Sequence, residues 1–265
     1  MSGGRETPAV TAPSIDQATL DTAVSLLRAA GERTLRWFRS ADLAVERKGD
    51  GTPVTAADKD AERFLREQLA DAFPADGVLG EEEAPTAGTS GRRWILDPID
   101  GTKAFTCGVP LYSNLLALED EHGIAVGVVN LPALGETVWA GRGLGCWSER
   151  GPARVSDHAT LQGAYVMSSS FSHWPEGSVR SLEQAGAVLR TWGDGYGYAL
   201  VATGRVAAMV DPAAAPYDLG PMPVLLAEAG GRFSDLTGAD TIEGGSGMAT
   251  NGHVHDALLA VLHPH

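Results

Sequence analysis

The chain has 265 residues, of which 43% are hydrophobic and 20% are charged, enough for one large domain or two fused lobes with a substantial core. The formal net charge is −14 and no run of Lys and Arg interrupts it, which argues against nucleic acid and anionic membranes as partners. No apolar run reaches the roughly 20 residues of a membrane span.

Residues 1–13 are small, polar and proline-bearing, without the apolar stretch of a signal peptide, so we expect a disordered lead. The cysteines are Cys107 and Cys146, with no C-x-x-C pair. We interpret them as two buried free thiols of a reducing compartment, and we therefore expect a cytoplasmic protein.

Two helices are predicted near the start of the chain. Apolar residues such as Leu20, Val24 and Leu27 recur at helical spacing over 14–39, where Ser14 can cap the helix. A strand and a loop are expected over 40–53. A second helix is expected from a cap at Thr55 to about residue 73.

The pattern then changes to strands, which we predict at 94–97, 113–118, 124–130, 136–141 and 145–148. Short turns between them indicate an antiparallel sheet. After residue 151, strands at 155–156, 164–168, 188–191 and 207–210 alternate with helices at 178–187, 196–203 and 219–229, which is an α/β pattern. We expect an N-terminal α+β lobe over 14–150 that holds the metal site, and an α/β lobe over 151–265, sharing one core.

The segment from Asp97 to Thr102 carries the clearest chemical signal. Asp97 ends an apolar strand, Pro98 is expected to stop that strand, and Asp100 is expected to be the N-cap of a helix that starts at Gly101-Thr102. The free N–H groups of a helix start can bind phosphate, and a glycine lets the ligand approach closely.

Two other acidic signals lie far away in the sequence. Glu81, Glu82 and Glu83 follow the apolar residues 78–79, and Asp218 stands where an apolar helix is expected to begin. Taken alone, an acidic run is usually a solvated surface and a single Asp is a plain cap. If these carboxylates converge, they form a set of hard oxygen donors that suits Mg²⁺ or Mn²⁺ rather than Zn²⁺, and their mutual repulsion requires bound cations.

Five segments resemble the inositol monophosphatase family: VTAADKDAE at 54–62, GEEEA at 80–84, WILDPIDGTKAF at 94–105, PYDLGPMPVLLAEAGG at 216–231 and ATNGHVHDALL at 249–259. The resemblance covers nearly the whole chain. It implies a mixed α/β fold, the layered αβαβα sandwich of the inositol monophosphatase and fructose-bisphosphatase type. It also implies a homodimer and a phosphomonoesterase that uses two to three Mg²⁺ ions per site, for which Mn²⁺ can substitute.

The resemblance also assigns metal ligands. Glu81, Asp97 and the carbonyl of Ile99 would bind the first metal, and Asp97, Asp100 and Asp218 would bind the second.

Other roles follow from the same resemblance. A weaker third metal would lie at Glu81 with help from Asp58. Thr102 and Glu81 would hold the attacking water, Asp58 would orient Thr102, and the amides of Gly101 and Thr102 would hold the phosphate. Glu82 would support the site without binding metal. Hydrolysis would proceed by direct attack of metal-activated water, without a phospho-enzyme.

Within the family, the chain is most similar to histidinol-phosphate phosphatases of the actinobacterial type, on residues 76–82, 92–103 and 250–259. The segment 190–196 is also similar, with Gly195 inserted before an aromatic residue. Arg190, Asp194 and Asp211 are therefore candidate substrate-binding residues. The two aspartates can bind an ammonium group, although each can equally be a solvated or capping acid.

The chain departs from the family at Tyr217, where Trp is usual, at Ala104, where Asn is usual, and at Thr106-Cys107, where an apolar–basic pair is expected. These departures leave several substrates open. We expect hydrolysis of L-histidinol phosphate to L-histidinol, with inositol-1-phosphate, another cyclitol, a sugar or a nucleoside monophosphate as alternatives. A non-catalytic binding module is a remote alternative, because the ligand carboxylates are all present.

Overall fold

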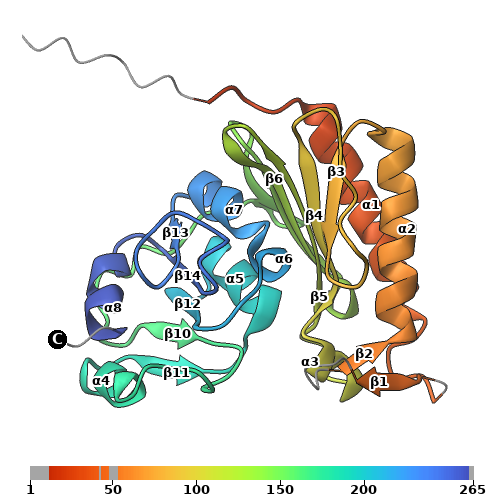
Figure 1. Ribbon diagram of the computed structural model, residues 1–265. Helices are drawn as coiled ribbons and strands as arrows, with labels where there is room; N and C mark the ends of the chain where they lie inside the picture. The colour runs from red at the N-terminus through yellow and green to blue at the C-terminus, as the bar shows by residue number, and fades with distance from the viewer. Residues whose placement is uncertain (1–11, 42, 48–52, 263–265) are drawn as a thin grey trace, which may run out of the picture.

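The structure is a computed structural model that describes residues 12–41, 43–47 and 53–262. Five layers succeed one another across the molecule (Figure 1). The helices α1 (Gln17–Leu35) and α2 (Ala56–Ala72) cover one face of a seven-stranded sheet, and α5 (Asp194–Ala202) and α7 (Met222–Ala229) lie between this sheet and a five-stranded sheet. The outer face of the second sheet carries α4 (Ser178–Gln184) and α8 (His255–Leu262). The predicted αβαβα sandwich is therefore confirmed.

The seven-stranded sheet has the order β3-β4-β5-β6-β7-β8-β9. From β4 onward, neighbours in the sheet are neighbours in sequence and run antiparallel, as the short turns predict. The strand β3, which was not predicted, pairs parallel to β4. The bounds are β3 (Gly77–Gly80), β4 (Arg93–Asp100), β5 (Ser113–Asp120), β6 (Gly123–Leu131), β7 (Glu136–Gly141), β8 (Gly145–Ser148) and β9 (Gly151–Pro152).

The second sheet has the order β11-β10-β12-β14-β13. Its members β10 (Tyr165–Met167), β11 (Val188–Arg190) and β12 (Ala208–Asp211) are parallel, whereas β14 (Gly247–Thr250) runs antiparallel to β12 and β13 (Arg232–Ser234). The predicted strand at 155–156 is wrong, since these residues form no strand. A separate hairpin joins β1 (Val45–Arg47) and β2 (Pro53–Thr55), and most of the loop expected between them lies outside the described residues.

Capping side chains fix where the first two helices begin. Asp16, not the predicted Ser14, caps α1, because its carboxylate accepts a hydrogen bond from the Thr19 amide at 2.8 Å. The predicted cap of α2 is confirmed at Thr55. Its side chain accepts from the backbone of the first turn, and the carboxylate of Asp58 accepts from the Thr55 amide at 2.8 Å.

The main apolar cluster lies between the two sheets and draws on both halves of the chain, for example Ile95, Leu115, Met209 and Leu225. A second cluster packs α1 and α2 against the opposite face of the first sheet. Cys146 is buried, but Cys107 is exposed, so the prediction of two buried thiols is wrong for Cys107. Within the described residues, no helix combines the length and apolar character needed to cross a membrane.

Candidate active site

The Asp97–Asp100 turn lies inside a strand rather than after one. β4 continues through Pro98 to Asp100, and its pairing with β5 shifts register between Asp97 and Asp100. The prediction that the strand ends at Asp97 is therefore wrong, although the ladder is interrupted at Pro98, which has no partner on β5. Residues three apart on a regular strand face opposite sides of the sheet, and the irregularity allows both carboxylates to reach one space.

The residue that starts the following helix is Gly101, not Asp100. Gly101 has φ +81° and is the N-cap of α3 (Thr102–Thr106), so the predicted N-cap role of Asp100 is wrong. A left-handed backbone of this kind favours glycine. The carboxylate of Asp194 also packs here, since a Cβ added at Gly101 would lie 2.8 Å from its Oδ2.

Asp218 reaches the same space from the other side of the site. It lies within the short helix α6 (Pro216–Leu219), where its Oδ2 accepts from the Ala215 amide at 2.7 Å, so the predicted helix at 219–229 is in fact α6 followed by α7. One oxygen each of Asp97, Asp100 and Asp218 lie within 4.8 Å of one another. The structure thus brings these three predicted ligands together.

Glu81 comes to this cluster because β3 runs beside β4, with Gly80 paired to Leu96. The turn that follows is held by Glu62, which sequence reasoning missed. Its fully buried carboxylate accepts from the amides of Glu82 and Glu83 at 2.8 and 3.0 Å. The Arg66 guanidinium donates to the same carboxylate at 2.8 Å and balances its charge.

The carboxyl groups of the cluster have strongly perturbed acidities. Burial, followed by the charges of neighbouring acids, raises the pKa of Asp97 and of Asp100 well above the ordinary value. Burial is also the main cause that raises the pKa of Asp218 to about 7, and the charge of Glu81 adds to it. Hard oxygen donors that repel one another in a buried space fit Mg²⁺ or Mn²⁺.

Asp58 has one satisfied oxygen and one that is not. Its Oδ2 accepts from the Thr55 hydroxyl at 2.6 Å, whereas its Oδ1 is buried and has no hydrogen-bond partner among the described residues. Thr102 donates its hydroxyl hydrogen to the Ile99 carbonyl at 3.0 Å. The described residues show no hydrogen bond between Asp58 and Thr102, so the orientation of Thr102 by Asp58 stays a prediction. A buried carboxylate oxygen without a partner suits a bound cation or an ordered water.

Asp194 and Asp211 are brought together through Ser169. The Ser169 amide donates to Asp211 Oδ1 at 3.1 Å, and the Asp194 amide donates to Ser169 Oγ at 2.9 Å. Burial raises the pKa of Asp211 to about 6 and also raises that of Asp194. Arg190 does not join them through any contact in the described part of the chain. Its exposed guanidinium donates to the carbonyl of Leu189 at 2.7 Å.

The inserted glycine has a contact that sequence reasoning missed. The Gly195 amide donates to Asp100 Oδ2, and the Ser113 hydroxyl donates to the same oxygen at 2.9 Å. A Cβ at position 195 would collide with Ser113 Oγ and lie 2.9 Å from Leu115 Cδ2. The insertion in the 190–196 segment is the only signal in the sequence that points to this position.

The family model that describes inositol monophosphatases matches residues 16–265. The chain belongs to the inositol monophosphatase family. It is 40% identical over 249 residues to a histidinol-phosphatase of Mycobacterium tuberculosis, with 91% of this chain and 96% of that protein covered. A histidinol-phosphatase of Streptomyces coelicolor is also 40% identical, over 250 residues, with 89% and 94% covered.

A solved inositol monophosphatase from Anabaena superposes with a TM-score of 0.81 at 28% identity, covering 93% of this chain and 95% of that one. The family and the fold class that the motifs predict are both confirmed.

Proposed function

We propose that this protein is a Mg²⁺-dependent phosphomonoesterase that hydrolyses a small phosphate ester with water as the nucleophile. The observation that carries the proposal is the convergence of Asp97, Asp100 and Asp218 oxygens within 4.8 Å, beside the start of α3, in a chain of this family. When bound, divalent cations would neutralise the ester and increase the acidity of water.

In this proposal the chain supplies the ligands. Asp97, Asp100 and Asp218 bind one Mg²⁺, and Glu81 and the Ile99 carbonyl join Asp97 at another. The Ile99 carbonyl already accepts from Thr102, but a carbonyl oxygen has a second lone pair for a cation. The buried Asp58 Oδ1 and Glu81 are our candidates for a third, weaker position.

The first turn of α3 binds the phosphoryl group. The backbone N–H groups of Gly101 and Thr102 are at a helix start and lack intrahelical partners, so they can donate to phosphate oxygens. The Thr102 hydroxyl and the Glu81 carboxylate orient the water, whose proton passes through the Thr102 hydroxyl to Glu81. For this, the Thr102 hydroxyl leaves the Ile99 carbonyl and donates to Glu81 while its oxygen accepts from the water. The alcohol oxygen that leaves phosphorus takes a proton from solvent water.

For the substrate we propose L-histidinol phosphate. Two features support this choice. Relatives named histidinol-phosphatase are 40% identical over most of the chain, and Asp194 lies beside Gly101 and is linked through Ser169 to a second acid, Asp211. These acids would accept hydrogen bonds from the ammonium group of an amino alcohol. We leave Arg190 out of this set because its guanidinium is bonded at the edge of the sheet.

Inositol-1-phosphate or another cyclitol phosphate is the second candidate. It is favoured by the similarity to the Anabaena inositol monophosphatase. The departures at Tyr217 and Ala104, which lie close to Asp218 and Thr102 in sequence, leave the choice of substrate open. Sugar and nucleoside monophosphates remain in the test panel.

The experiment is a phosphate-release screen with Mg²⁺ and with Mn²⁺ against an aryl phosphate, histidinol phosphate, inositol-1-phosphate, a sugar phosphate and a nucleoside monophosphate. We expect kcat/KM for histidinol phosphate to exceed every other value at least tenfold, about 1.4 kcal/mol, and Asp97→Asn to abolish turnover. No turnover with any ester would refute the phosphatase, and a smaller preference would refute the substrate.

The homodimer that the sequence resemblance implies and the cytoplasmic location expected from the cysteines belong to the same proposal. Both described cysteines are free, which agrees with a reducing compartment. Light scattering on the Mg²⁺-loaded protein would test the dimer, and a monomer over the whole working concentration range would refute it.

A further inference from the structure

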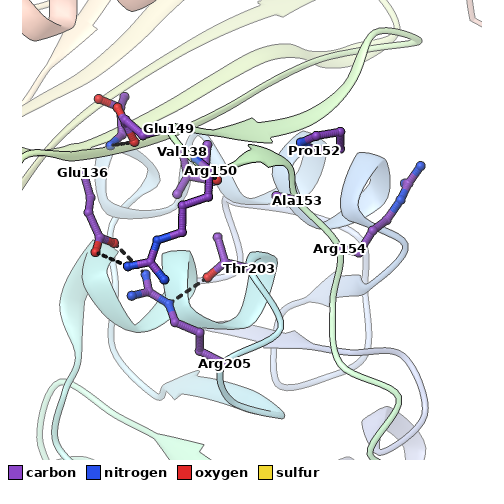
Figure 2. A pocket seen from close by; sticks show the side chains of 11 residues that line it. Glu136, Val138, Glu149, Arg150, Pro152, Ala153, Arg154, Thr203 and Arg205 are labelled. Carbon is purple, nitrogen blue, oxygen red and sulfur yellow. Dashed lines mark hydrogen bonds and ion pairs between the residues drawn. The ribbon is translucent and has the colours of Figure 1, made fainter.

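A cavity of about 310 Å³ lies where the last strands of the first sheet meet the end of α5 (Figure 2). None of the residues in the carboxylate cluster lines it. Its walls come from β7, from β8 and β9 with the turn between them, and from the segment after α5. The lining residues that matter here are Glu136, Thr137, Glu149, Arg150, Thr203 and Arg205.

Two guanidinium groups in this cavity share one carboxylate. Arg205 and Arg150 contact the two oxygens of Glu136 at 2.8 and 3.5 Å, and Arg205 Nε also donates to Thr203 Oγ1 at 3.0 Å (Figure 2). These bonds use three of the ten N–H groups that two guanidiniums offer. The two guanidiniums therefore carry more positive charge than Glu136 neutralises, and they have N–H donors left over.

The second acid of the cavity does not offset this excess. Glu149 accepts from Arg28 at 2.9 Å and from the Thr137 amide at 2.6 Å, so its charge is already balanced. A third lining arginine, Arg154, donates to the Glu228 carbonyl, a group without net charge. A local positive surplus in a chain of net charge −14 attracts an anion. We propose that this cavity binds a small oxyanion, a phosphate or carboxylate group, held by Arg150 and Arg205.

A buried hydrogen-bond chain connects the cavity with the active site. Thr137 Oγ1 donates to Asn130 Oδ1 at 3.2 Å, Asn130 Nδ2 donates to Asn114 Oδ1 at 3.0 Å, and Asn114 Nδ2 donates to the Pro98 carbonyl at 2.6 Å. All three side chains are buried. The chain crosses β7, β6 and β5 and ends between Asp97 and Asp100.

This chain has little freedom to adapt, because its members lie in a packed interior. A Cβ at Gly31 of α1 would collide with Asn130 Nδ2 and lie 2.9 Å from Asn114 Oδ1, so the helix closes the space around the two amides. A shift of Thr137 therefore has to be followed by its partners or break a buried hydrogen bond. An oxyanion whose binding moves Thr137 would therefore be coupled to the Asp97–Asp100 turn and would change turnover.

Helix α5 supplies a second connection between the same two places. Its last turn leads into Thr203 and Arg205 in the cavity, and Arg205 lies over the ring of Tyr196 at 5.8 Å. Its first turn carries Gly195, whose amide binds Asp100. Both routes lead to the same ligand carboxylates.

Calorimetric titration of the Mg²⁺-loaded protein with inorganic phosphate tests the site directly. We expect two phosphates per chain for wild type and for the control Arg180→Gln, an exposed arginine on α4, and one for Arg150→Gln/Arg205→Gln. Glu136→Gln frees both guanidiniums and should tighten the second site severalfold. Equal phosphate counts in the double variant and wild type would overturn the site, as would unchanged or weaker binding in Glu136→Gln. One phosphate in wild type and none in the double variant would instead leave this site standing and refute the phosphate site at α3.

Kinetics at saturating substrate test the coupling, and this arm rests on the proposed function. Saturating ester displaces phosphate from the active site, so any change in kcat that added phosphate still causes arises at the second site. We expect a change of at least twofold in wild type and in Arg180→Gln. The change should vanish in Arg150→Gln/Arg205→Gln. Thr137→Val should still bind two phosphates but lose the effect on kcat. The coupling would be overturned if phosphate left the kcat of wild type unchanged, or if phosphate changed the kcat of Thr137→Val as much as that of wild type.

Discussion

Removal of divalent cations should make the stability of this protein depend on pH in a specific direction. Burial and neighbouring charges raise the pKa of Asp58 and of Asp218 to about 7 in the folded chain, from 3.8 for an ordinary aspartate. Between these values the folded carboxyl keeps a proton that the unfolded one has lost. The free energy of unfolding therefore falls as pH rises from about 4 to about 7, and is flat above.

The magnitude can be worked out for Asp58, which is fully buried. The difference between 3.8 and about 7 corresponds to about 4 kcal/mol, of which about 3 kcal/mol is lost between pH 5 and pH 8. At roughly 2–4 °C per kcal/mol for a domain of this size, this loss lowers Tm by about 8 °C. In chelator, the Asp58→Asn variant should not show this contribution to the loss of stability, because an amide does not titrate.

The assay is thermal unfolding in chelator and in saturating Mg²⁺ at pH 5 and pH 8, for wild type, Asp58→Asn and the control Asp256→Asn. Asp256 pairs with Arg232 at the surface and its side chain is 89% exposed, so its variant should follow wild type. Mg²⁺ should raise the Tm of wild type far more at pH 8 than at pH 5, because at pH 8 protons no longer compete with the cation for the carboxylates. If wild type and Asp58→Asn lost the same stability from pH 5 to pH 8, the reasoning would be refuted.

Three further substitutions should act through defined contacts. Gly195→Ala drives a methyl into Ser113 Oγ and should lower Mg²⁺ affinity and kcat at least tenfold, measured by metal titration and steady-state kinetics; unchanged values would contradict the contact. Glu62→Gln weakens the hydrogen bonds to the amides of Glu82 and Glu83 and should lower the free energy of unfolding by about 2 kcal/mol, measured with denaturant. A loss below about 0.5 kcal/mol would show that other contacts hold the turn. Thr102→Val should reduce kcat about a hundredfold with KM little changed, and Thr102→Ser should restore most of it; equal activity of the two would exclude the hydroxyl from the reaction.

Local signals predicted most of the secondary structure because they act over a few residues. The cap at Thr55 and the turns between β5 and β8 depend on neighbours in sequence, and both expectations hold. For the first helix the predicted cap is Ser14, but the side chain that meets the Thr19 amide is that of Asp16, two residues further along the chain. Pro98 was misjudged because a register shift lets a proline remain in the strand.

The site was predictable as a set of residues but not as a geometry. Spacing alone did not show that Asp97, Asp100 and Asp218 meet, and the motifs of the family supplied that expectation. The contacts that were missed join distant segments: Glu62 lies 20 residues from the amide it binds at Glu82, and Gly195 lies 95 residues from Asp100. No local pattern marks such partners, since each becomes visible only when the sheets and helices have assembled.

Under the proposed function, the start of α5 would join substrate recognition to metal binding in two consecutive residues. Asp194 has φ +53°, a conformation that aspartate tolerates better than most side chains, and its carboxylate rests against Gly101. The next amide, that of Gly195, binds Asp100. A substitution at Asp194 that changed substrate preference would therefore also shift the contact between the Gly195 amide and Asp100, because relaxing that strained backbone moves the amide. Tyr217 and Ala104 depart from the family pattern while Asp97, Asp100 and Asp218 are all present, so under the proposed function a change at these two positions would alter selectivity without removing a ligand carboxylate.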